Sequence, residues 1–368
     1  MTLTLVFIVI LVTLAFTYTN GFHDTANSIA TVVGTKVLTP RQAIILATVT
    51  NLIGALVGTA VARTIAAGLV DADFVSSYTL ICALLGAILW NLITWYVGLP
   101  SSSSHALVGG LCGAALASAH GNWKALVWAN PPPVGKPWWH GSGLLYKVII
   151  PMVSSPVCGF IIALVLMGSL YLILQKYRPT TVRKIFGKAQ LLSSAYMGFS
   201  HGTNDAQKTM GIIALALVTA TKSGVFDHLP AWLNFLYTAE TADPKNQDIA
   251  LWIKIICALT MAAGTAVGGW RIIKTLGYRL VKLQPVHGFA AETAGATVLL
   301  LTALMGMPVS TTHVITTSIM GVGASKRLNA LKWSVAERIV WAWIFTLPAT
   351  AGVGYLLMCG VQVAGLAR

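Results

Sequence analysis

Long apolar runs recur along the chain, and they decide what it can fold into. Each is long enough for a helix that crosses the hydrocarbon core of a bilayer, which takes about 20 residues. The runs cover residues 42–62, 76–98, 148–174, 251–270, 286–305 and 339–360. Charged residues make up only 9% of the chain, whereas soluble domains carry roughly 25%. The sequence therefore predicts an all-α polytopic membrane protein.

The basic residues indicate how the chain is oriented. A formal net charge of +14 raises the question of a nucleic-acid partner. Most Lys and Arg residues, however, lie in short loops between the apolar runs, at 36–41, 175–190, 271–285 and 325–338. This is the pattern of cytoplasmic loops, and no nucleic acid is expected. The sequence predicts a multi-pass protein of the plasma (inner) membrane with both termini external.

The second half of the chain repeats the plan of the first. At an offset of 181 the matching pairs are Gly21 with Gly202 and Asp24 with Asp205; at an offset of 208 they are Gly98 with Gly306, Pro100 with Pro308, Ser102 with Ser310 and His105 with His313. The offset grows because loop 221–250 is longer than loop 36–41. Internal repeats of this kind are common in secondary transporters. We predict two inverted repeats with broken helices, 1–175 and 191–368, joined by a basic cytoplasmic linker at 176–190.

In each half a proline begins a short run rich in Ser or Thr, which we call a hydroxyl turn. The two hydroxyl turns are residues 100–105 and 308–313. Proline ends the preceding helix, and a hydroxyl can cap the next one, whose amides and positive end then face the turn. Irregular backbone at membrane depth is tolerated only where it is buried in protein or lines a cavity. Polar turns between packed helices are the alternative interpretation. We predict two re-entrant loops that form an oxyanion cradle from Ser102, Ser103, Ser104, Ser310, Thr311 and Thr312.

A polar group lies within each signature stretch, 20–27 and 199–211. Ionisable residues in membrane segments indicate function, and the candidates are Asp24, Asn27, Asn204, Asp205 and Lys208; a structural hydrogen-bond network is the alternative. The hydroxyls and the lysine suit an anion, but the carboxylates repel one. Either a proton or cation travels with the anion, or the anion donates its own O–H groups. Phosphate near neutral pH has such groups and sulfate has none, which favours phosphate.

Other polar residues have weaker interpretations. Glu292 lies seven residues into a span and is predicted to be a gate or a proton-coupling group, with a helix-end glutamate as the alternative. His105 and His313 are predicted to support the hydroxyl turns or to transfer protons. The alternative is that they pack between helices. His23 and His201 do not match across the repeat, so no symmetric role is expected. We also expect Asn20 and Gly21 to interrupt the first helix.

Four motifs carry a family resemblance. The stretches 21–27 (Gly-Phe-His-Asp-Thr-Ala-Asn) and 202–208 (Gly-Thr-Asn-Asp-Ala-Gln-Lys), with the two hydroxyl turns, resemble the inorganic phosphate transporter (Pit/PiT) family over nearly the whole chain. The resemblance implies a sodium-, proton- or metal-coupled phosphate symporter, a homodimer, and phosphate bound between the hydroxyl turns and the signature helices. It implies no enzyme activity, no resident metal and no cofactor beyond the co-transported proton or cation.

Two departures from the sodium-coupled branch favour protons. Asn51 lies where that branch has Glu, and Lys208 where it has Asn, so the chain looks more like the bacterial low-affinity Pit type, which takes up metal–phosphate complexes with protons. Glu292 is retained as in the sodium branch. A fixed ammonium at Lys208 can replace a bound cation. We predict a proton-coupled phosphate importer, with Asp24, Asp205, Lys208, Glu292 and Asn51 as coupling candidates; a sodium symporter and a sulfate permease of the same family are the alternatives.

Overall fold

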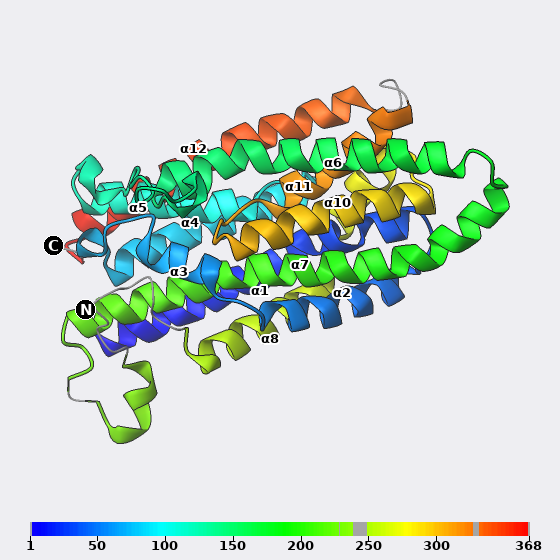
Figure 1. Cartoon of the computed structure of the whole chain (residues 1–368). Helices are drawn as coiled ribbons and strands as arrows, with labels where there is room; N and C mark the ends of the chain where they lie inside the picture. Colours follow the sequence, from blue (N-terminus) through cyan, green and yellow to red (C-terminus); the bar gives the residue numbers. More distant parts are fainter. Residues whose placement is uncertain (1, 228, 238–248, 327–330, 367–368) are drawn as a thin grey trace.

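Helices build the described part of the chain, as the apolar runs predict (Figure 1). The structure is a computed structural model that describes residues 2–227, 229–237, 249–326 and 331–366. Its α-helices are α1 (Leu3–Gly34), α2 (Pro40–Ala55), α3 (Ala60–Ala67), α4 (Ser77–Val97), α5 (Ser103–Ser118), α6 (Ile150–Leu174), α7 (Pro179–Lys222), α8 (Leu251–Val267), α9 (Trp270–Lys274), α10 (Pro285–Leu304), α11 (Thr311–Lys326) and α12 (Trp333–Val363). By length and composition, five helices of the described chain can cross a membrane, or up to seven if each bent pair is one span.

The two halves pack on each other reciprocally. Helix α1 lies against α8, and its counterpart α7 lies against α2, the counterpart of α8. In the same way α5 packs on α12 and α11 packs on α6. Figure 1 shows α1 and α7 running in opposite directions along the bundle. Two inverted repeats would give such an arrangement, and they stay a prediction.

The two chain ends lie at one end of the bundle, and the turns after α1 and α6 lie at the other (Figure 1). A cavity of about 710 Å³ at that second end is lined by Lys36, Tyr177 and Leu283, so three of the predicted basic loops meet there. We call this the basic end and the opposite one the terminal end. The predicted linker 176–190 is helical from Pro179 onward, because α7 continues through it without a break.

The signature helices are continuous, which corrects the expected interruption at Asn20 and Gly21. Helix α1 runs through both residues without a break. Gly21 instead allows close packing against a neighbouring helix. A Cβ on Gly21 would lie 2.6 Å from the Met261 carbonyl oxygen of α8. A Cβ on Gly202 of α7 would lie 2.2 Å from the Asn51 carbonyl oxygen of α2. Each signature glycine therefore lets two helix backbones touch.

The breaks lie instead in two of the apolar runs predicted as single spans. Run 42–62 divides into α2 and α3, bent by 68°, and run 251–270 divides where α8 meets α9, bent by 59°. The first break has Gly58 in the left-handed conformation, at a φ of 82°. The side-chain oxygen of Gln207 accepts a hydrogen bond of 2.8 Å from the Val61 amide. A side chain of α7 thus accepts a hydrogen bond from a backbone amide at the start of α3 that has no partner within its own helix.

Candidate functional site

The hydroxyl turns begin with one capping residue each. The Ser102 hydroxyl accepts a hydrogen bond from the His105 amide at 3.1 Å, and the Ser310 hydroxyl accepts one from the His313 amide at 3.2 Å. These bonds define the starts of α5 and α11, as the sequence predicts. Both residues are predicted substrate ligands, but here their side chains serve their own helices. The hydroxyls that follow them reach the signature helices instead.

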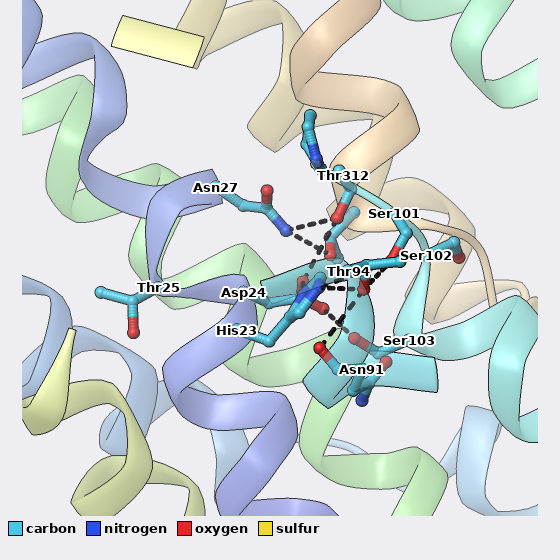
Figure 2. A network of polar contacts seen from close by, with 12 residues as sticks. His23, Asp24, Thr25, Asn27, Asn91, Thr94, Ser101, Ser102, Ser103 and Thr312 are labelled. Atoms are coloured by element: carbon cyan, nitrogen blue, oxygen red, sulfur yellow. Dashed lines mark hydrogen bonds and ion pairs between the residues drawn. The ribbon is translucent and has the colours of Figure 1, made fainter. Parts of the chain in front are cut away.

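In the first half-site, Asp24 of α1 collects hydroxyl groups from both turns (Figure 2). Its Oδ2 accepts from Ser103 at 2.9 Å, and its Oδ1 accepts from Thr312 at 3.3 Å. Asn27 lies one turn further along α1 and donates to Thr311 at 3.1 Å and to Thr312 at 2.9 Å. The first signature stretch therefore contacts the hydroxyl turns of both halves.

The second half-site repeats this arrangement with one change of charge. Asp205 of α7 accepts from Thr311 at 3.2 Å, as Asp24 accepts from Ser103. Lys208 takes the place of Asn27, and its ammonium donates to Asp205 at 2.5 Å and to the Val309 carbonyl at 2.9 Å. It also donates to the Ser104 hydroxyl. One half-site thus holds an amide where the other holds a buried cation.

Every predicted substrate ligand is buried in the described structure. Their side chains are at most 3% exposed: Asp24, Asn27, Ser102, Ser103, Ser104, Asn204, Asp205, Lys208, Ser310, Thr311 and Thr312. Within the described chain, the side-chain oxygen of Asn27 and both polar atoms of the Asn204 side chain have no hydrogen-bond partner. Buried polar groups normally have one. The Asn204 amide nitrogen, the hydroxyls of Ser103, Ser104, Thr311 and Thr312 and the positive ends of α5 and α11 can donate to an oxyanion. The two amide oxygens can only accept, for example from an O–H group of the anion.

Each aspartate also has a histidine neighbour, which corrects the expectation of no symmetric role for His23 and His201. His23 Nδ1 lies 2.7 Å from Asp24 Oδ1, and His201 Nε2 lies 3.1 Å from Asp205 Oδ2. A comparison of matching positions misses this because one histidine precedes its aspartate by one residue and the other by four. His201 also contacts Asn51 at 2.8 Å. One ligand atom each of Asp24, His201 and Asp205 lie within 4.8 Å of one another, so a cation could be held there.

Glu292 is fully buried away from the helix ends, which rules out the alternative of a glutamate at the lipid headgroups. Its carboxylate accepts from Thr31 at 2.5 Å, from Gln190 at 3.1 Å and from Ser193. Gln190 in turn accepts from Thr35 at 2.9 Å. Thr35 lines the cavity at the basic end. A chain of polar side chains that the sequence did not reveal therefore runs from Glu292 to that cavity.

His105 and His313 pack against each other where the two turns meet. Their rings lie edge to face with centroids 4.7 Å apart. His313 also stacks on Trp343 at 4.0 Å, and the Trp343 indole donates to the Pro100 carbonyl at 3.2 Å. Two residues at matching positions thus touch directly, and their rings hold both turns in place.

Two hydrogen bonds secure the turns from outside the site, and we call them the latches. At the terminal end, the Thr64 hydroxyl of α3 donates to the Gly306 carbonyl at 2.7 Å. At the basic end, the Thr275 hydroxyl of the π-helix η7 (Thr275–Arg279) donates to the Gly98 carbonyl at 2.9 Å. Each latch joins a broken span of one half to the turn of the other half.

Comparisons with known proteins decide the family. The model of the phosphate transporter family matches residues 20–354. The chain belongs to this family. A probable low-affinity inorganic phosphate transporter of Bacillus subtilis (strain 168) is 41% identical over 354 residues, which cover 96% of each chain. One of Rhizobium meliloti (strain 1021) is 41% identical over 348 residues, covering 94% of this chain and 93% of the relative.

A solved structure shares the fold. The sodium-dependent phosphate transporter matches with a TM-score of 0.78 at 23% identity, covering 98% of this chain and 100% of that one. Together with the family match, this confirms the resemblance drawn from the four motifs and the helical membrane fold. The chain is a phosphate transporter of the membrane and not an enzyme.

Proposed function

We propose that this protein imports inorganic phosphate together with protons, and that the substrate lies between the two hydroxyl turns. Ser103, Ser104, Thr311 and Thr312 would donate to its oxygens, aided by the positive ends of α5 and α11. Asp24 would accept an O–H group of the substrate, as it accepts hydroxyls of the protein here. A dianion without O–H groups would leave such carboxylates facing negative oxygens, which favours phosphate over sulfate.

The contacts of Lys208 carry the proposal of proton coupling. Its ammonium lies among one carboxylate oxygen, one hydroxyl and one backbone carbonyl, from Asp205, Ser104 and Val309. Oxygen atoms of these kinds also bind hard metal cations. A fixed ammonium in this position leaves less need for sodium. The site then holds two carboxylates and one lysine, a formal charge of −1, and one proton would make it neutral.

The proposed proton leaves through Glu292. Asp24 and Thr31 are seven residues apart on α1, about 10 Å along a helix that rises 1.5 Å per residue. Thr31 donates to Glu292, whose described partners are all neutral groups. Gln190 and Thr35 continue from there to the cavity at the basic end. The basic loops favour this end as the cytoplasmic side, and the proposed direction of transport is toward it.

Uptake of radiolabelled phosphate into proteoliposomes tests the proposal, with the pH gradient and the sodium gradient imposed separately. We expect an inward proton gradient to drive accumulation and a sodium gradient alone to have no effect. Dependence on sodium, with indifference to pH, would refute proton coupling. Excess sulfate should not compete. A divalent-metal chelator that stops uptake would identify a metal–phosphate complex as the cargo, while unchanged uptake would identify free phosphate.

The variant Lys208→Asn tests the residue on which the proposal depends. It gives the second half-site the amide of the first and changes the formal charge of the site from −1 to −2. We expect proton-driven uptake to fall about tenfold, equivalent to about 1.4 kcal/mol on the barrier, and added sodium to restore part of it. Lys332→Asn, an exposed lysine at the start of α12, is the matched control. Unchanged proton-driven uptake in Lys208→Asn would show that the ammonium has no part in coupling.

A further inference from the structure

A second cationic region lies outside the transport site, at the terminal end of the bundle. A cavity of about 380 Å³ opens between α3, the segment before α6 and the end of α10. Its lining includes Arg63, His140 and Lys147, together with the hydroxyl residues Thr64 and Ser142. None of the described residues that line it is acidic. Cations are expected mainly at the opposite, basic end, so this cluster needs its own explanation.

Lys147 is held in place by protein contacts. Its side chain is buried, and its ammonium donates to the backbone carbonyls of Trp139 and Met305 at 2.8 Å each. Met305 follows α10 directly, so one role of Lys147 is to neutralise the negative end of that helix. That role accounts for one cation in the cavity wall. Arg63, which comes from α3, lines the same cavity.

The cavity adjoins the turn that closes the transport site. Gly306 lines it and accepts the latch hydrogen bond from Thr64. Three residues further on, the Val309 carbonyl accepts from Lys208 and from Ser104 inside the site. The segment 306–309 therefore has the cationic cavity on one side and the phosphate ligands on the other. One segment therefore contacts both the cavity and the proposed transport site.

We propose that this cavity is an entry site that binds inorganic phosphate through Arg63 and Lys147 before segment 306–309 admits it to the transport site. The proposal rests on the proposed function, because only a phosphate importer needs to collect phosphate at this end. Guanidinium groups match phosphate oxygens in pairs. A volume of about 380 Å³ holds a phosphate with several waters, since each water occupies about 30 Å³ in the liquid. Cations in a cleft also raise the rate at which an anion arrives.

The first experiment compares Arg63→Gln with Lys124→Gln, a matched control that removes an exposed charge from the connection between α5 and α6. We expect Arg63→Gln to raise the KM for external phosphate about tenfold with Vmax within about twofold, and to weaken the dependence of KM on ionic strength. Arg63→Lys should keep most of the wild-type KM, and Lys124→Gln should behave like wild type. An unchanged KM and salt dependence in Arg63→Gln would overturn the proposal.

The second experiment measures binding without transport. In a background with the 5 native cysteines replaced by Ala and with Asp24→Asn to stop transport, Ser142→Cys places a thiol in the cavity wall. We expect inorganic phosphate to slow the reaction of this thiol with an anionic reagent, and Arg63→Gln to abolish that protection. Protection that persists in Arg63→Gln, or none at all, would refute the entry site. A wild-type protein that takes up no phosphate would instead refute the proposed function.

Discussion

Asp24 and Asp205 lie at matching positions and each accepts a hydroxyl from the re-entrant helix of its own half. One turn further along, however, α1 carries Asn27 and α7 carries Lys208. Both groups bind hydroxyls of the opposite turn, but only the ammonium also binds the aspartate of its own helix. A repeat that is symmetric in geometry is thus asymmetric in charge. On the proposed function, coupling would be confined to the half with the lysine while both halves hold the substrate.

The largest expected effects come from removing each carboxylate in turn. Asp24→Asn should lower phosphate uptake about 100-fold, since two hydrogen bonds to a charged group are together worth about 3 kcal/mol. Asp205→Asn should lose uptake as well and also lose about 3 kcal/mol of stability, because Lys208 is left buried without its counter-ion. Uptake in proteoliposomes and thermal unfolding in detergent measure the two effects.

The difference between these two variants is the test of the comparison. Asp24→Asn should lower the unfolding temperature less than Asp205→Asn does, because the remaining amide oxygen can still accept from the Ser103 and Thr312 hydroxyls and no buried lysine loses its counter-ion. Equal loss of stability in both variants would show that the ion pair with Lys208 does not make Asp205 more important for stability than Asp24.

A smaller effect is expected from Glu292, a buried acid whose matching position in the first half is not acidic. Glu292 matches Leu84 in the first half, a fully buried apolar residue. Glu292→Gln cannot carry a proton, so we expect net proton-driven uptake to fall about tenfold, equivalent to about 1.4 kcal/mol. Exchange of labelled for unlabelled phosphate across the membrane should continue and should no longer depend on pH. Glu337→Gln, an exposed glutamate of α12, should leave both activities intact. Loss of exchange together with net uptake would assign Glu292 to folding or binding instead.

The latches offer the mildest perturbation of the two halves. Thr64→Val and Thr275→Val each remove one hydrogen bond, worth about 1 kcal/mol or about a fivefold change in an equilibrium. We expect them to shift access to the site in opposite directions. With Thr311→Cys in the cysteine-free background, an impermeant thiol reagent added outside should react faster in Thr64→Val and slower in Thr275→Val. Shifts in the same direction would mean that the latches are not opposed gates.

Much of this architecture could be predicted from local patterns. The apolar runs predicted the helices, and the proline and hydroxyl spacing predicted where α5 and α11 begin. These features depend on residues that lie close together in the sequence. The buried positions of Asp24 and Asp205 were predictable for the same reason, since each lies in an otherwise lipid-compatible stretch.

What could not be predicted depends on partners far apart in the sequence. Run 42–62 is apolar enough to be predicted as one span, and its break is stabilised by Gln207, a residue of another helix. The surroundings of Glu292 come from α1 and α7, and the histidine beside Asp205 was hidden by its different spacing. The glycines at 21 and 202 were visible, but only packing shows that they bring helices together and do not break them.

The reciprocal packing of the two halves also bears on how the protein is made. Helix α5, which begins at one hydroxyl turn, packs chiefly on α12, which follows it much later in the sequence. Helix α6 likewise packs on α11, which follows it in the sequence. During synthesis, the polar turn of the first half must remain in the membrane without its final cover until α12 has been made. A chain truncated before α12 is therefore a natural substrate for membrane quality control, even though most of its transport residues have already been made.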